Sequence, residues 1–449
     1  MAETPDLLEL CKAAIDAAEN GEAVEAYGAE SRHTEVRARK GEVEGLTFSE
    51  SRGVGVRLIA GGAVGFAWAA DPSEAEIVET VARARENAAL AEADEHNGLP
   101  DAAPIDPIAA LYRADQAEMA LDRKVDLAIG LERKATSTDP RVHNCDDVVY
   151  GDSVSRVSIG STLGLDATYE RTDTWCMVVA LAVEEDETQT GFSFRIGREL
   201  GDLAWEEVAD EAVQRATAML GAAKPSSGRV PIVFDPFAGS SFLGVLGGAL
   251  SAEAVQKGRS LFADRVGETL GSDVFTLIDD GRELDGPAAA PFDDEGVPTG
   301  RTELITAGKL NGFLHNTYTA RRGGTSSTGN ASRGGYRTSP SVGTSNFFVQ
   351  PGSRAPEELL RDAAGWVLIN DVSGVHSGAN PISGTFSVGA TGWRIGPGGE
   401  VGEPLREMTI GSTIPEMLAG VTGVGNDLRF FSSVGTPTLL IDEMTLAGV

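Results

Sequence analysis

The chain has 449 residues, with 68 acidic and 37 basic side chains, so its formal net charge is −31 at pH 7. A negative field of this size repels phosphate backbones and excludes a broad nucleic-acid-binding face. Hydrophobic residues make up 41% and charged residues 23%, which argues against wholesale disorder, and at this length two or three folded domains are expected.

Three features of the sequence bear on cellular location. The three cysteines lack metal-ligand spacing, and their odd number fits a reducing compartment. The acidic N-terminus places its apolar residues at helical spacing, unlike a signal peptide. No apolar run approaches the length of about 18 residues that a membrane span requires. We therefore expect a cytoplasmic protein with neither a membrane nor a nucleic-acid partner.

The first half of the chain predicts helices around an antiparallel meander. Thr4 and Pro5 are typical of a helix start, and the apolar residues that follow keep helical spacing up to Gly21. Alternation over residues 31–69 predicts the meander, and Ser73 with Glu76 forms a capping-box pattern that opens a helix to about residue 93. The same reasoning predicts a helix over 114–135, several strands over 141–197 and a helix over 205–221.

The second half changes character after the polar stretch 224–229, which we interpret as a boundary. A strand over 230–235 precedes a helical stretch, 239–260, and then come many short strands broken by glycine. Helices are expected there only over 354–368 and 414–421. The sequence thus predicts an α+β protein with two domains, 1–224 and 230–449, each a largely antiparallel sheet with a few helices, the second glycine- and turn-rich.

A search for reactive groups finds no motif with specific spacing. The five histidines are far apart in the sequence, and no serine lies in a nucleophile elbow. The acidic turn at 292–301 contains Asp293 and Glu295, which could bind a cation or act as acid and base. The favoured interpretation is a polar turn in which these carboxylates cap backbone amides.

Four segments in order give the chain its resemblance to a known family. They are EVEGLTFSESRGVGVRLIAGGAVGFAWAADPSEAEI, PFDDEGVPTGRTELITAGKLNGFLHNTYTARRGGTSSTGNA, GVGNDLRFF and PTLLIDEMTLAG. Together they resemble the TldD/PmbA (TldD/TldE) family. The resemblance implies that a TldD-type subunit is a metallopeptidase with an H-E-x-x-x-H motif on a helix and a cysteine ligand near its C-terminus. It also implies that the PmbA (TldE) type is a partner without these ligands.

Aligned on QKGRS at 256–260, the family motif falls on residues 243–248 of this chain. Leu243 and Gly248 stand where the two ligands are expected and Gly244 where the base is expected, and residues 427–440 contain no cysteine. Zinc catalysis needs about three protein ligands with N, O or S donors and an activated water. Two ligands five residues apart on an ideal helix also point about 140° apart, so an active version needs a distorted helix.

The resemblance leads to a hypothesis with two alternatives. The leading hypothesis is a PmbA/TldE-like, non-catalytic subunit that binds no metal and pairs with a zinc-containing, TldD-like metallopeptidase acting on unfolded peptides. One alternative is a free-standing, metal-independent enzyme of the same fold acting on a peptide-derived metabolite. The other is a homo-oligomeric peptide-binding protein, with a homodimer as its simplest form. Candidate peptide-binding or cavity residues are Asp293, Glu295, His315, Tyr318 and Arg321.

Overall fold

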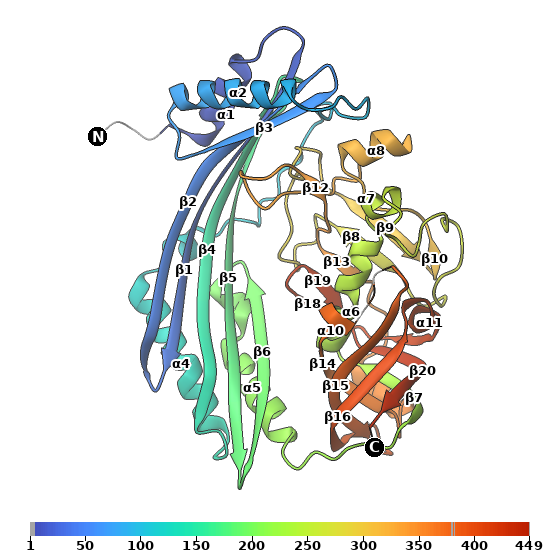
Figure 1. Cartoon of the computed structure of the whole chain (residues 1–449). Coiled ribbons are helices and arrows are strands. Elements are labelled where there is room, and N and C mark those ends of the chain that lie inside the picture. The colour runs from blue at the N-terminus through green and yellow to red at the C-terminus, as the bar shows by residue number, and fades with distance from the viewer. Residues whose placement is uncertain (1–4, 379, 381, 449) are drawn as a thin grey trace.

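A computed structural model describes residues 5–378, 380 and 382–448. The α+β class is confirmed, and strands of the first half form one six-stranded antiparallel sheet with the order β3-β2-β1-β4-β5-β6. Its strands are β1 (Glu22–Arg39), β2 (Glu42–Ala60), β3 (Ala63–Ala70), β4 (Asn144–Ser161), β5 (Asp166–Glu184) and β6 (Glu187–Gly197). The meander thus begins at Glu22, earlier than the predicted residue 31, and its strands are long and curved (Figure 1).

Helices cover one face of this sheet. They are α1 (Leu7–Asp16), α2 (Glu74–Ala89), α3 (Ala114–Ala117), α4 (Leu121–Thr138), the 3-10 turn η1 (Leu200–Leu203) and α5 (Trp205–Ala218). Alternate residues of β5, from Cys176 to Ala182, are buried in one apolar cluster with residues of α4 and α5. Because side chains alternate across a strand, the intervening residues of β5 face away from these helices.

The second half contains two further six-stranded sheets rather than one. One has the order β16-β15-β14-β7-β20-β17 and the other β10-β9-β8-β13-β19-β18, and β11 pairs with β12 alone. The strands are β7 (Gly228–Phe234), β8 (Leu277–Asp280), β9 (Arg301–Thr306), β10 (Lys309–Leu310), β11 (Ala331–Ser332), β12 (Ser341–Val342), β13 (Phe347–Val349), β14 (Val367–Ser373), β15 (Thr385–Ile395), β16 (Val401–Thr413), β17 (Val421–Val424), β18 (Arg429–Phe431), β19 (Val434–Thr436) and β20 (Leu439–Ala447). No described sheet mixes strands from the two halves, while the exact domain limits stay a prediction.

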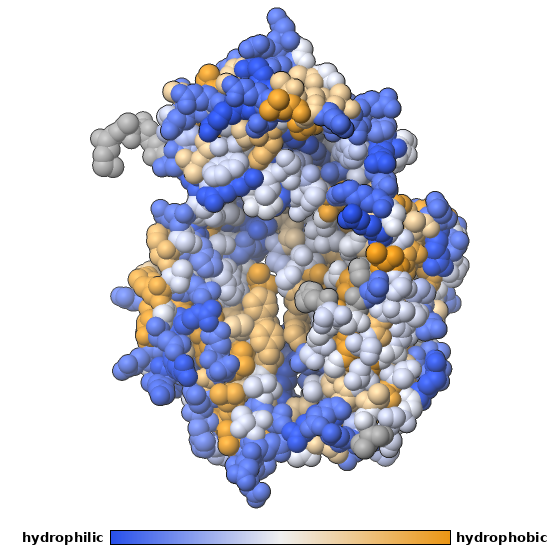
Figure 2. Space-filling model, in the orientation of Figure 1, coloured by the Kyte–Doolittle hydropathy of each residue, from blue (hydrophilic) through white to orange (hydrophobic). Residues whose placement is uncertain are grey.

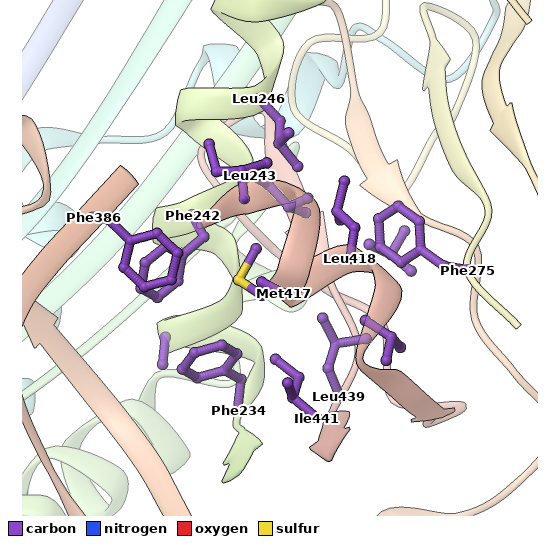
Figure 3. Close-up of a cluster of buried hydrophobic side chains, with 14 of the residues drawn as sticks. Phe234, Phe242, Leu243, Leu246, Phe275, Phe386, Met417, Leu418, Leu439 and Ile441 are labelled. Atoms are coloured by element: carbon purple, nitrogen blue, oxygen red, sulfur yellow. The ribbon is translucent and has the colours of Figure 1, made fainter. Parts of the chain in front are cut away.

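The helices of the second half are short. They are α6 (Pro236–Ala249), α7 (Ala252–Gln256), α8 (Thr317–Gly323), α9 (Pro356–Asp362), α10 (Val375–Gly378) and α11 (Ile414–Ala419). Helix α6 packs against β7 and β14 of one sheet and against β13, β18 and β19 of the other. Its side chains Phe242, Leu243 and Leu246 therefore lie in the main core, beside Phe234, Phe386 and Leu418, as Figure 3 shows. None of the described helices is both long and apolar enough to cross a bilayer.

Several predicted helix limits were wrong. The first helix begins at Leu7, because the side chain of Asp6 accepts a hydrogen bond from the amide of Leu8, and Thr4 lies outside the described residues. The helix expected over 114–135 is two helices separated at residues 118–120. The helix expected over 354–368 ends at Asp362, after which the chain enters β14.

Candidate functional site

The helix α6 begins earlier than expected because of two residues before the glycine-rich stretch. Asp235 directly follows β7 and caps the helix, because its side chain accepts a hydrogen bond of 2.8 Å from the amide of Ala238. Pro236 occupies the first helical position. Burial raises the pKa of Asp235 to about 6, although Arg215 of α5 lies 3.2 Å from its carboxylate and opposes this shift. The stretch 239–260 is thus two helices, α6 and α7, rather than one.

The glycines of α6 do two different things. A Cβ atom at Gly239 would lie 2.8 Å from Thr436 and one at Gly247 would lie 3.0 Å from Thr344, so these two glycines permit close contacts. At Gly244 and Gly248 an added Cβ would meet nothing within 4 Å. Close packing therefore accounts for the glycines on only one face of the helix.

Gly244 and Gly248 lie in the wall of a pocket of about 610 Å³. Its wall comes from α6, from the end of β14 with α10, and from β18 with β19. The lining residues are Ser240, Ser241, Gly244, Val245, Gly248, Val372, Gly374, Val375, Phe431 and Val434. None of these carries an ionisable side chain, and both serine hydroxyls donate to the carbonyl of Phe237.

The structure brings together two of the regions that the resemblance singles out. Gly244, Gly248 and the segment 427–440, through Phe431 and Val434, meet at this pocket. Leu243 does not, because it is 3% exposed and lies in the core on another face of α6 (Figure 3). An α-helix turns by about 100° per residue, so residues 243 and 248 point about 140° apart on α6 and face different surroundings.

The residues of this pocket do not fit a zinc ion. Glycine and valine side chains provide no donor, and the hydroxyls already bond within the helix. Within the described part of the chain, no group of three His, Cys, Asp or Glu side chains is placed to hold a metal.

Asp293 and Glu295 lie elsewhere and are engaged by the protein itself. The Asp293 carboxylate accepts hydrogen bonds of 2.9 Å from the amides of Glu295, Val297 and Ala331, as the capping interpretation expects. Burial, with the nearby Glu295, raises the pKa of Asp293 to about 8. Glu295 is fully buried and lies 2.7 Å from a guanidinium nitrogen of Arg57 in β2.

The other three predicted residues lie around α8. The hydroxyl of Tyr318 donates to Asp94 at 2.9 Å, and the guanidinium of Arg321 donates to the carbonyl of Leu99 at 2.8 Å. Both contacts join the second half to the segment after α2. His315 has a pKa below its ordinary value because it is partly buried. None of the five predicted residues lines the pocket at α6, and their role in binding a peptide stays a prediction.

Sequence reasoning missed the aromatic residues beside the pocket. The rings of Phe192 and Phe237 lie 5.5 Å apart, and those of Phe237 and Phe431 lie 5.1 Å apart. We call these three residues the aromatic ridge. They come from β6, α6 and β18, so only the fold places them together, and no local pattern marks them.

Known structures share this fold over nearly the whole chain. A Thermotoga maritima protein, described as a candidate modulator of a DNA gyrase, is 27% identical and has a TM-score of 0.90, with 98% of this chain and 99% of that chain covered. TldE from Thermococcus kodakarensis has a TM-score of 0.90 at 24% identity, again with 98% and 99% covered. The protein is thus an α+β protein of the class formed by these structures.

The sequence places it in a particular family. Models of the PmbA/TldA metallopeptidase match domain 1 at residues 24–88, the central domain at 114–220 and the C-terminal domain at 227–448. The chain belongs to the PmbA/TldD family. The metalloprotease PmbA of Escherichia coli O157:H7 is 27% identical, with 92% of this chain and 89% of that protein covered. A PmbA homologue of Haemophilus influenzae is 28% identical over the same shares.

Proposed function

We propose that this protein is a PmbA/TldE-type, non-catalytic subunit that pairs with a TldD-like zinc metallopeptidase in the cytoplasm to process unfolded peptides. One observation carries the proposal: the positions of α6 that face the pocket are glycine, serine and valine. A catalytic zinc needs three ligands and an open position for water, and these residues provide neither ligands nor a general base. The zinc therefore belongs to the partner, and this chain helps to enclose and hold the peptide.

An exposed strand edge in the first half suits the partner. Strand β3 pairs only with residues 53–60 of β2, so among the described strands the outer edge of residues 42–52 has no neighbour. Leu46 and Phe48 are 50% and 60% exposed there, and Leu121 of α4 lies beside them. Unpaired edges with exposed apolar side chains are typical association sites. We assign this strand edge and its apolar patch to contact with the TldD-like subunit.

The test is co-purification of the full chain with a TldD-like metallopeptidase, followed by cleavage assays on an unfolded casein substrate. We expect a stable complex and zinc-dependent cleavage by the complex alone. The variant Phe48→Asp should weaken complex formation at least tenfold. Leu90→Asp is the matched control, because Leu90 is 87% exposed at the end of α2, a helix that packs against residues 54–58 of β2 rather than against its 42–52 edge.

Three outcomes would contradict the proposal. Metal-dependent cleavage by this chain alone would make it a peptidase in its own right. Stoichiometric zinc in the purified chain would contradict the interpretation of α6. A native mass that corresponds to a self-assembled oligomer, unchanged by the TldD-like protein, would favour the homo-oligomeric peptide-binding alternative.

A further inference from the structure

The inner face of the first sheet presents a row of apolar side chains near α6. In β5 and β6 the pairs Trp175–Ile196, Met177–Phe194 and Val179–Phe192 lie opposite one another in the antiparallel register. All six are partly exposed, and they lie on the face that α4 and α5 leave uncovered. Figure 1 shows this face turned toward the second half of the chain, and Figure 2 shows an apolar floor in the hollow between the two halves.

The aromatic ridge connects this row with the pocket at α6. Phe192 belongs to the row, Phe237 touches it, and Phe431 both touches Phe237 and lines the pocket. The three rings therefore connect β6 to α6, and Arg215, which lies 5.5 Å from the ring of Phe237, is paired with Asp235. Arg429 lies 4.8 Å from the ring of Phe431, but its charge is paired with Glu211 at 2.9 Å.

Strand β6 also offers backbone groups to a ligand. It is the last strand of its sheet, so its outer edge pairs with no other described strand. One carbonyl on this strand, that of Phe194, accepts a hydrogen bond from Arg429. An extended peptide can add to such an edge through its main chain, and its alternate side chains then point to one face of the sheet.

The chemistry of the lining selects the side chains of the ligand. A charged side chain that entered the pocket would lose its hydration without finding an opposite charge, whereas an apolar side chain would gain by burial. This neutral surface is unusual on a chain with a net charge of −31. The absence of side chains at Gly244 and Gly248 also leaves room for a large ring.

We infer that the cleft between β6 and α6 binds extended peptide segments with alternating apolar residues, and that the α6 pocket takes an aromatic side chain from them. The inference rests on the proposed function in one respect, that the chain holds peptides. It names the class of peptide, which the proposed function leaves open. Segments with charged residues at the alternating positions are rejected.

The test measures binding of fluorescein-labelled decapeptides to the full chain, alone and with its TldD-like partner, by fluorescence anisotropy. One peptide alternates Phe with Ser, and the other alternates Asp with Ser. We expect at least tenfold tighter binding of the Phe peptide. Gly248→Leu and Gly244→Leu should each remove most of this preference, because the new side chains fill the pocket. The control is Gly130→Ala in α4, where a Cβ atom meets Trp205 at an ordinary 3.7 Å.

The outcomes separate this inference from the proposed function. Equal binding of the two peptides, or no binding of either, overturns the inference even when the complex forms and cleaves casein. So does an unchanged preference in both leucine variants, provided that circular dichroism shows them folded. A preference for the Phe peptide without any complex with the TldD-like protein supports the inference and contradicts the proposed pairing.

Discussion

Arg57 is the residue whose loss should most clearly separate the two halves of the protein. Its guanidinium lies 2.6 Å from the carboxylate of Glu25 in β1 and 2.7 Å from that of Glu295 in the second half. Arg333, also from the second half, forms a second ion pair with Glu25. All four side chains are at least nine-tenths buried. We expect Arg57→Met to uncouple β1 and β2 from the loops that carry Glu295 and Arg333.

The magnitude follows from the partners that remain. In the variant, Glu25 keeps Arg333, whereas Glu295 keeps only a hydrogen bond of 2.8 Å from the amide of Thr317. A buried carboxylate without its counter-ion costs about 3–5 kcal/mol of stability. Total stability is about 5–15 kcal/mol for a folded domain, so this loss is a large part of it. The second change Glu295→Met removes the unpaired charge and should restore about 1–3 kcal/mol.

Urea unfolding, followed by tryptophan fluorescence and circular dichroism, measures these changes. The unfolding transition should be broader in Arg57→Met than in the wild type, because the two halves then unfold less cooperatively. Arg39→Met is the control, because Arg39 and Glu44 form a half-exposed pair that contributes about 1 kcal/mol or less. A loss below about 1 kcal/mol in Arg57→Met, or a double variant no more stable than the single one, would refute the reasoning.

Three further predictions concern other parts of the chain. Gly244→Ala should raise the unfolding free energy by about 0.5–1 kcal/mol, because alanine has a higher helix propensity than glycine and the new Cβ atom meets no neighbour. A lower unfolding midpoint in urea would contradict this. Glu211 is buried, which opposes ionisation, but its pairing with Arg429 lowers its pKa to about 2. Its stabilisation is complete above the unfolded pKa of about 4.3 and is lost as the pH falls towards 2, up to about 3 kcal/mol. Glu211→Gln should therefore lose less stability than the wild type when the pH falls from about 5 to about 2.5, as measured by urea unfolding at both pH values. Burial raises the pKa of each thiol to about 12, so Ellman's reagent should label none of them before urea is added: Cys11, Cys145 and Cys176.

Local signals in the sequence predicted the elements that depend on local contacts. The capping box of Ser73 and Glu76 is present as expected, because both of its hydrogen bonds lie within one turn. The breaks after α3 and α9 were missed because apolar spacing continues across them, although Gly365, with a φ of +84°, is a local signal just after α9. Glu25 gave an unused signal: it is a charged residue within the apolar run AVEAYGA, a position that in a buried strand requires a partner.

The sequence marked one part of the pocket region and gave no signal for another. The glycine content of α6 was visible in the sequence, and the structure places Gly244 and Gly248 in a pocket wall. The aromatic ridge could not be predicted, because its three residues come from elements far apart in the chain. The acidic turn was interpreted correctly as a cap, yet the ion pair of Glu295 with Arg57 depends on how the two halves meet.

The position of α6 does not depend on any residue that faces the pocket. Asp235 caps the helix and is held by Arg215 of α5, while Phe242 and Leu246 fix the opposite face in the core. Metal ligands on the pocket side can therefore be absent without loss of the helix. They should also be tolerated there if they are added.

Gly244→His/Gly248→His tests which face of α6 can hold a metal. These positions are four residues apart, so both imidazoles should point into the pocket, as two histidines do in zinc motifs of that spacing. We expect zinc binding with a Kd in the micromolar range, about −8 kcal/mol, by calorimetry. Adding Val434→Cys from β19, which lines the same pocket, should tighten it at least tenfold.

The matched variant is Leu243→His/Gly248→His, which follows the spacing of the family motif. Leu243 lies in the core, so this pair should bind zinc at least tenfold more weakly and should also destabilise the protein by about 2–5 kcal/mol, the cost of losing a large core side chain. If it bound zinc as tightly as the first pair, α6 would have to rotate or distort in solution. The separation of residues 243 and 248 onto two faces would then be wrong. The expected order instead follows from helix geometry, because residues 244 and 248 share the face that the pocket exposes and residue 243 does not.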